Sequence, residues 1–210
     1  MTVVDADELK RLLADYGIES RSEKSIKLLI YNKLLEKWNS RINLSGAANW
    51  HSLRLFFQEG IWSSNFYPHD AFSHLDIGSG AGFPAMLLRI LIPKLSMDLV
   101  ESRAKRAAFL ETVVGELNLS KTHIHCARLD EFLRKSEKIW DCITWKGLRL
   151  TSCDLLQLCN HSHPKTQFWM FHGKSMPVEE PAILNRRFRL LGSERFPPKR
   201  EWKLSIFIPK

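Results

Sequence analysis

A strand that leads at once into a glycine-rich turn, at residues 74–84, constrains the fold of this chain more than any other segment. His-Leu-Asp-Ile has the composition of a buried β-strand, and a Gly-x-Gly-x-Gly turn follows at Gly78, Gly80 and Gly82. Glycine allows positive φ and leaves no Cβ between the backbone and a ligand. A second apolar run, at 97–100, ends in Glu101 about twenty residues later, the spacing of a ribose-binding acid. The pair predicts a nucleoside-cofactor site at the edge of an α/β sheet.

Two classes of cofactor compete for this site, and the acidic residues favour one of them. Dinucleotide-binding turns carry Gly-x-Gly-x-x-Gly and face a pyrophosphate, whereas here the third glycine comes one residue early. Asp76 lies two residues before the first glycine, where a carboxylate suits a cationic ligand better than a diphosphate. S-adenosylmethionine (AdoMet) carries a sulfonium and an ammonium group and no phosphate. We therefore expect AdoMet, with Glu101 accepting hydrogen bonds from its ribose; NAD and a turn without a ligand are the alternatives.

Strand-like and helix-like segments alternate from residue 72 onward. Strands are expected at 73–77, 96–100, 122–126, 139–144 and 167–172, with helices at 84–91, 103–117, 129–135 and 151–160. Such alternation predicts a mostly parallel sheet with right-handed crossovers. Two further strands, at 188–191 and 204–208, have no helix between them and predict a hairpin at the sheet edge. The pattern predicts the Rossmann-like class I AdoMet-dependent methyltransferase fold, with a seven-stranded sheet and a terminal antiparallel hairpin.

Three helices are expected before the sheet, at 5–16, 23–40 and 50–66, the last with an interruption at Gly60. Gly17 follows the first of them as its C-terminal cap. We expect residues 1–66 to form a helical extension packed on the sheet. Residues 67–210 are then expected to form one compact methyltransferase domain.

Basic residues exceed acidic ones by 31 to 23, which gives a formal net charge of +8. The excess is concentrated at 185–210, where eight basic side chains stand against Glu194 and Glu201. A basic segment of this kind predicts a polyanionic partner, although charge by itself does not distinguish RNA, DNA and a membrane surface. The start of the sequence lacks a secretory pattern and the longest apolar run is too short to cross a bilayer, so a cytoplasmic protein is expected.

The four cysteines predict no metal site. Cys126 and Cys142 lie in strand-like surroundings and are expected to be buried core thiols. A local cluster of two cysteines and two histidines has a spacing that matches no common zinc pattern, at Cys153, Cys159, His161 and His163.

Four stretches of the sequence carry a resemblance to a known family. They are a Trp-Asn…Asn-Leu motif, the glycine turn, the second strand with its following helix, and a segment like Arg-x-Glu-Glu, at residues 35–44, 75–84, 99–110 and 128–132. In these stretches the chain resembles the 16S ribosomal RNA guanine-N7 methyltransferase family, also called RsmG or GidB. The resemblance is good over about residues 25–145 and looser elsewhere.

The resemblance implies an AdoMet-dependent enzyme that methylates small-subunit ribosomal RNA. It implies that Gly78 and Phe83 line the donor site and that Leu129 and Asp130 flank the adenine. Together with the turn and the ribose acid, the expected cofactor-binding residues are Asp76, Gly78, Ser79, Gly80, Gly82, Phe83, Glu101, Ser102, Leu129, Asp130 and Lys146. The implied partner is 16S rRNA or the small ribosomal subunit, without a membrane, and we expect a monomer.

Three departures from the family pattern fall on the half expected to meet RNA. The family's Ser-Arg-Ala after the fourth strand is Trp-Lys-Gly here, and Lys146 loses the planar donor geometry of arginine. The family's Lys-Gly after the fifth strand is His172-Gly173, and its Arg-His…Asp-Ser in the third helix retains only Arg54. The candidates for positioning the substrate are Lys146, Arg54, Arg128, His172, Lys174 and Arg200.

Guanine N7 carries a lone pair and no proton, so no residue is expected to act as a general base. Two alternatives remain open beside a guanine-N7 rRNA methyltransferase. One is an AdoMet-dependent methyltransferase with a different substrate. The other is an RNA-associated protein that binds AdoMet with little or no turnover.

Overall fold

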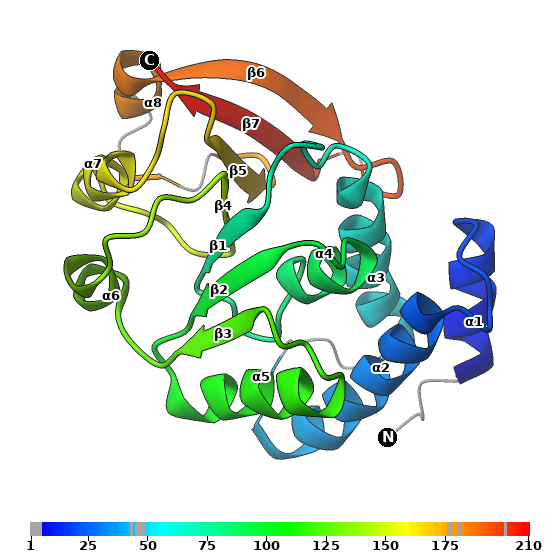
Figure 1. Ribbon diagram of the computed structural model, residues 1–210. Helices are drawn as coiled ribbons and strands as arrows, with labels where there is room; N and C mark the ends of the chain where they lie inside the picture. The colour runs from blue at the N-terminus through cyan, green and yellow to red at the C-terminus, as the bar shows by residue number, and fades with distance from the viewer. Residues whose placement is uncertain (1–5, 43, 45–48, 176–177, 180–181, 200) are drawn as a thin grey trace.

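A mixed seven-stranded sheet lies at the centre of the molecule, with strand order β3-β2-β1-β4-β5-β7-β6 (Figure 1). The computed structural model describes residues 6–42, 44, 49–175, 178–179, 182–199 and 201–210. The strands are β1 Ser73–Ile77, β2 Ser96–Val100, β3 Thr122–His125, β4 Cys142–Lys146, β5 Gln167–His172, β6 Phe188–Arg195 and β7 Lys203–Pro209. Strands β1 to β5 are parallel and β7 is antiparallel to both of its neighbours. The predicted fold class is confirmed.

The fourth strand begins later than the sequence predicts. The expected strand at 139–144 is instead Cys142–Lys146, which pairs with β1 and β5. Residue Asp141 serves another purpose, because its carboxylate accepts the backbone N–H groups of Phe72 and Ser73, each at 2.9 Å. This contact holds the start of β1 beside the residue before β4, and the pairing of β4 begins at Cys142.

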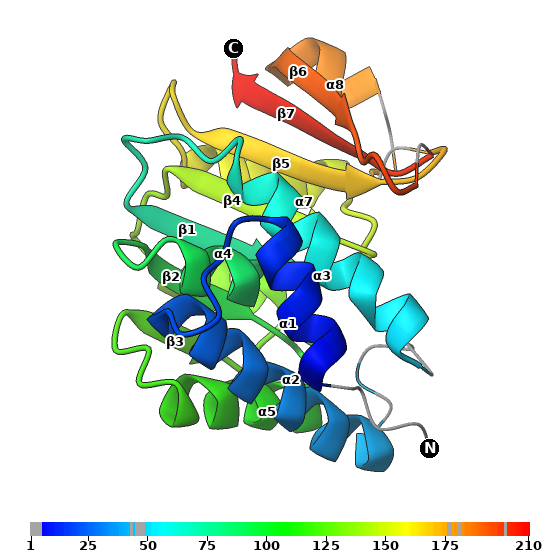
Figure 2. The same cartoon turned by 90° about the vertical axis from the view of Figure 1, so that its right-hand side faces the viewer.

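Helices cover both faces of the sheet (Figures 1 and 2). On one face lie α1 Ala6–Asp15, α2 Glu23–Ile42, α3 Trp50–Ser64, α4 Ala85–Leu91 and α5 Ala104–Glu116. The other face packs against α6 Leu129–Lys135 and α7 Ser152–Asn160. A short helix that the sequence did not predict, α8 Ala182–Arg187, precedes β6. Gly17 has φ of 70° directly after α1, as expected of a C-terminal cap.

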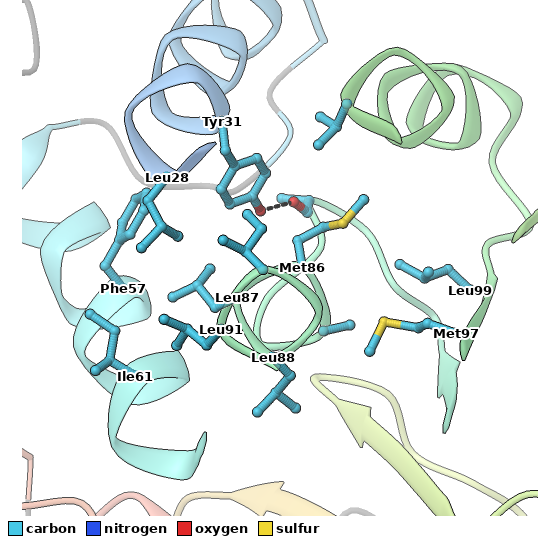
Figure 3. Packing of buried hydrophobic residues seen from close by; sticks show 14 of the residues in the cluster. Leu28, Tyr31, Phe57, Ile61, Met86, Leu87, Leu88, Leu91, Met97 and Leu99 are labelled. Atoms are coloured by element: carbon cyan, nitrogen blue, oxygen red, sulfur yellow. Dashed lines mark hydrogen bonds between the residues drawn. The ribbon is translucent and has the colours of Figure 1, made fainter. Parts of the chain in front are cut away.

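The helices that precede the sheet share its hydrophobic core. Figure 3 shows Tyr31 of α2 and Phe57 of α3 directed towards the leucines of α4. The expected interruption at Gly60 is absent, because α3 runs through it. A Cβ at this position would lie 2.5 Å from Leu87 Cδ2, so glycine allows α3 to approach α4 closely. The division of the chain at residue 66 stays a prediction.

The C-terminal hairpin is present and longer than expected. Strand β6 contains Gly192, which the sequence assigned to the connection, and a β-bulge lies between Leu190 and Gly192. The bulge lets the strand continue past the glycine, so the turn begins only after Arg195. Strand β7 inserts between β5 and β6 and thereby completes the sheet.

Two of the cysteine predictions have different outcomes. Cys142 is fully buried in β4, as expected. Cys126 is exposed, because β3 ends at His125 and the thiol belongs to the loop that follows. Within the described ranges, no three His, Cys, Asp or Glu side chains are grouped so that they could hold a metal ion. In the same part of the chain, no helix has the length and apolarity needed to cross a membrane.

Candidate cofactor and substrate site

A cavity of about 790 Å³ lies beyond the carboxyl ends of β1, β2 and β4. This is the edge at which open parallel sheets bind their ligands. Nine of the eleven expected cofactor-binding residues line it: Gly78, Ser79, Gly80, Phe83, Glu101, Ser102, Leu129, Asp130 and Lys146. Leu44, the last residue of the Trp-Asn…Asn-Leu motif, lines it as well, whereas Asn43 lies outside the described residues.

The glycine turn uses its three glycines in different ways. Gly78 and Gly80 have φ of 67° and 56° and lie on the cavity wall. Gly82 has φ of 89° and faces the core, where a Cβ would lie 2.7 Å from Met86 Cγ and 3.1 Å from Tyr31 Oη. Tyr31 donates a hydrogen bond of 2.5 Å to the carbonyl of Ala81 (Figure 3, dashed line). The α2 helix therefore supports the turn from behind.

Glu101 is held in place before any ligand arrives. Its side chain follows β2 and is almost fully buried. One carboxylate oxygen accepts the N–H of Gly80 at 2.9 Å, and the other accepts the N–H of Arg103 at 2.8 Å. A carboxylate offers about four acceptor sites, so two remain for the hydroxyls of a ribose. The two hydrogen bonds fix the direction of the Glu101 carboxylate, so ligand binding costs little further conformational entropy of this side chain.

Asp76 lies behind the turn and is not among the residues that line the cavity. Its carboxylate accepts a hydrogen bond of 2.5 Å from Thr144, whose hydroxyl lies 2.9 Å from His74 Nε2. The Nδ1 atom of His74 in turn lies 2.9 Å from the hydroxyl of Tyr67. Burial raises the pKa of Asp76 to about 7 and lowers the pKa of His74 to about 3. Since Thr144 donates to Asp76, the neutral His74 donates through Nε2 and accepts from Tyr67 through Nδ1.

Basic side chains surround the mouth of the cavity. Leu129 and Asp130 begin α6 on one side, and the side chain of Arg128 beside them is mostly exposed. Its Nε lies 3.7 Å from Asp130 Oδ1, a weak contact at the surface. The sequence analysis did not select three further arginines of the lining, Arg103, Arg106 and Arg149. Only knowledge of which loops meet at this edge could have indicated them.

A second cavity, of about 330 Å³, adjoins the first. Both cavities are lined by the last residue of β4, Lys146, and by the segment that follows it, residues 147–149. The second one extends towards α3 and the end of β5, where Glu59, His172 and Trp202 complete its wall. Lys146 therefore lies at the boundary between the two cavities.

Lys146 is surrounded by a carboxylate and two aromatic rings. Its ammonium group forms a salt bridge with Glu59, a carboxylate that is almost fully buried on α3. The same nitrogen lies 4.5 Å from the ring centroid of Phe56 and 5.1 Å from that of Trp202. Burial raises the pKa of Glu59, and the nearby ammonium of Lys146 opposes that rise.

A row of stacked rings connects the two cavities. Phe83 in the cofactor cavity stacks on Phe56 at 5.3 Å, and Phe56 stacks on Trp202 at 6.1 Å. His172 lines the second cavity, and both of its ring nitrogens are hydrogen-bonded, since Nδ1 lies 2.9 Å from the carbonyl of Gly173 and Nε2 lies 2.9 Å from Ser205 Oγ. Burial lowers the pKa of His172, so the ring is neutral at pH 7.

The remaining substrate candidates lie elsewhere. Arg54 is exposed on α3, interacts electrostatically with Tyr16 of the N-terminal region, and lines neither of these two cavities. Lys174 is exposed and also lines neither, although its neighbour Gly173 does. Arg200 lies outside the described residues. The sequence analysis did not select Glu59 or Trp202 as site residues. Glu59 entered it only as a departure from the family's Asp-Ser, and nothing local marks Trp202 as part of a cavity.

The family described as rRNA small subunit methyltransferase G, GidB, matches residues 24–195. The chain belongs to this family. A ribosomal RNA small subunit methyltransferase G of Bartonella bacilliformis is 33% identical over 197 residues, 91% of this chain and 89% of that protein. The relative of the same name in Wolinella succinogenes is 38% identical over 122 residues, 58% of this chain and 63% of that protein, so this match spans just under two thirds of its length.

Solved structures share the fold at low sequence identity. An O-methyltransferase from Bacillus cereus in complex with SAH has a TM-score of 0.60 and 14% identity, over 96% of this chain and 97% of that one. The AdoMet prediction is thereby confirmed for this family and fold. The residues fit the cofactor as well, because the cavity has the size of a ligand site and presents the fixed carboxylate of Glu101.

Proposed function

We propose that this protein transfers a methyl group from AdoMet to N7 of a guanine in 16S ribosomal RNA. The observation that carries the proposal is the fixed carboxylate of Glu101, between the glycine turn and a mouth lined with arginines, in a chain of this family. The reaction takes place in the cytoplasm on the small ribosomal subunit or its RNA, and the enzyme acts as a monomer.

Each part of the cofactor cavity has a task in this reaction. Bound AdoMet supplies an electrophilic methyl group. Glu101 accepts hydrogen bonds from the ribose, and Asp130 accepts one from the exocyclic amine of the adenine. The backbone at Gly78 and Gly80 leaves room for the ligand to lie against the turn. These residues would hold AdoMet in one orientation, and such positioning would supply about 7–11 kcal/mol of the rate enhancement.

The chemistry needs alignment rather than proton transfer. The N7 lone pair would form the new carbon–nitrogen bond as the carbon–sulfur bond of AdoMet breaks, and sulfur would keep the electron pair. The positive charge moves from the sulfonium group to the base, and no proton is removed. The target base has to leave its stack, which costs roughly a few kcal/mol. Contacts between the arginines at the mouth and the RNA phosphates offset this cost.

A methyl-transfer assay tests the proposal. Tritiated AdoMet is incubated with the protein and with either naked 16S rRNA or small subunits from cells that lack this protein. We expect label in rRNA, and mass spectrometry should find 7-methylguanosine at one nucleotide. Incorporation at another atom or into another molecule would indicate a methyltransferase with a different substrate. Salt-sensitive RNA binding without incorporation would indicate a binding protein.

A further inference from the structure

We propose that Glu59 and Lys146 together read the target guanine, so that they determine the base specificity of the second cavity. The inference rests on the proposed function, because it takes guanine N7 as the acceptor. It starts from a buried ion pair beside the path of the methyl group. Lys146 lines both cavities, whereas Glu59 lines the second cavity only.

The order of these groups matches the order of atoms around guanine. With N7 directed towards the cofactor cavity, O6 comes next along the edge of the base, followed by N1–H and the N2 amine. Lys146, which stands between the cavities, then donates to O6. The Glu59 carboxylate, which lines the second cavity only, then accepts from N1–H and N2–H, as a carboxylate can accept two parallel hydrogen bonds.

Adenine reverses the polarity at both positions. It presents an amine where guanine has O6, so a donor would face the ammonium of Lys146. Its N1 is an acceptor and would face the carboxylate of Glu59. Pyrimidines have no N7 and leave nothing to methylate. The pair therefore rejects adenine by two mismatched polar contacts, each of which leaves a desolvated group without a partner.

The surroundings of the pair suit this role. Glu59 has a buried carboxylate, so a hydrogen bond to it is formed away from water. The rings of Phe56 and Trp202 flank Lys146 and hold its ammonium group at the boundary of the two cavities. His172 is neutral and its nitrogens are already bonded, so it adds no competing charge. The pair has no net charge and does not oppose the positive charge that arises on the base.

A substrate that lacks the N2 amine of guanine tests the proposal. Inosine differs from guanosine only by the absence of the N2 amine, so it lacks one hydrogen bond to Glu59. We compare kcat/KM for 16S rRNA that carries guanosine or inosine at the methylated nucleotide, in whichever form, naked or assembled, the protein methylates. The wild-type protein should prefer guanosine by about 10- to 100-fold.

Two variants show whether Glu59 causes this preference for guanosine. In Glu59→Gln, the ratio of guanosine to inosine should fall to about three or less, while calorimetry still detects AdoMet binding. In Asp130→Asn, a matched carboxyl change in the cofactor cavity, the ratio should stay at its wild-type value. A wild-type ratio near one would overturn the reading by Glu59 and leave the proposed function intact. Absence of any methylation of guanine by the wild-type protein would overturn both. Should Glu59→Gln fail to fold, the wild-type ratio decides.

Discussion

The two cavities of this protein are built in different ways. The cofactor cavity is formed by turns that directly follow neighbouring strands, and its central contact joins Gly80 to Glu101 across 21 residues. The second cavity is formed by side chains from α3, β4, β5 and the hairpin, and its central contact joins Glu59 to Lys146 across 87 residues. Backbone N–H groups fix the first contact, whereas side chains alone make the second.

This difference has a consequence for specificity. A site fixed by backbone groups keeps its geometry when surrounding side chains change, so one turn can serve many methyltransferases that share a cofactor. A site made of side chains can be altered by one or two substitutions, without changing the fold. The variants considered below test whether this division between the two cavities is real.

The largest effect is expected at Glu101. Glu101→Gln loses the charge that accepts the ribose hydroxyls and places an amide donor against a backbone N–H. We expect the affinity for S-adenosylhomocysteine to fall by about 100-fold or more, measured by calorimetry. Glu59→Gln is the matched control and should keep the affinity within about threefold. An equal loss in both variants would contradict the separation of the cavities.

An effect of similar size concerns stability at the second cavity. Lys146→Met removes the partner of a buried carboxylate and should lower the free energy of unfolding by about 3 kcal/mol. The double variant Glu59→Gln/Lys146→Met leaves no unpaired charge and should recover about 2 kcal/mol of that loss. Denaturant titrations of the four proteins give the coupling. Additive losses would show that the pair stabilises nothing as a unit.

The same difference explains what the sequence could predict. The glycine turn, Glu101 and the alternation of strands and helices follow from local patterns, because each residue acts next to its own strand. The salt bridge of Lys146 and the position of Trp202 depend on how α3 and the hairpin pack, which no local pattern encodes. Gly60 illustrates the same limit. Glycine alone predicts a break in the helix, and only the close packing against Leu87 explains why a glycine lies inside α3. Arg54 was selected by its position in the family motif, and the fold leaves it outside the lining of both cavities.

Two glycines of one turn allow a finer comparison. Gly82→Ala should lower the free energy of unfolding by about 2 kcal/mol, because the new Cβ would lie 2.7 Å from Met86 Cγ. Gly80→Ala meets no protein atom closer than 3.7 Å and should cost about 1 kcal/mol, from its positive φ. The affinity for AdoMet should fall in Gly80→Ala, since this Cβ enters the cofactor cavity. Equal losses of stability in the two variants would place both glycines in the core.

Behind the glycine turn, Asp76 and His74 belong to one buried row of hydrogen-bonded side chains. These two groups should affect the pH dependence of stability in opposite directions. His74 has a lowered pKa, so its contribution to stability is present above about pH 6.5 and is lost as the pH falls towards 3. Asp76 has a raised pKa, so its contribution is present at acid pH and is lost as the pH rises from about 4 through 7. Between pH 4 and 6.5 the two contributions oppose each other, each by up to about 1.4 kcal/mol per pH unit.

Single variants separate the two contributions. His74→Gln should make stability rise as the pH is lowered through this range, relative to the wild-type protein. Asp76→Asn should make it fall. Unfolding curves at several pH values give both slopes, and all other titrating groups cancel when the two variants are compared. Parallel slopes would mean that protonation of His74 and Asp76 does not affect the free energy of unfolding.

The smallest effect should distinguish the mouth of the cavities from the rest of the basic surface. Arg149 is exposed and lines both cavities, whereas Arg54 is exposed and lines neither of them. Arg149→Gln should weaken binding to 16S rRNA about threefold, and should lower the slope of log affinity against log salt by about 0.7, the value for one single-strand phosphate contact. Arg54→Gln should leave both quantities unchanged, although it removes the same charge. If the two variants weaken binding equally, RNA affinity depends on the total charge of the protein, and the arginines at the cavity mouth do not position the RNA.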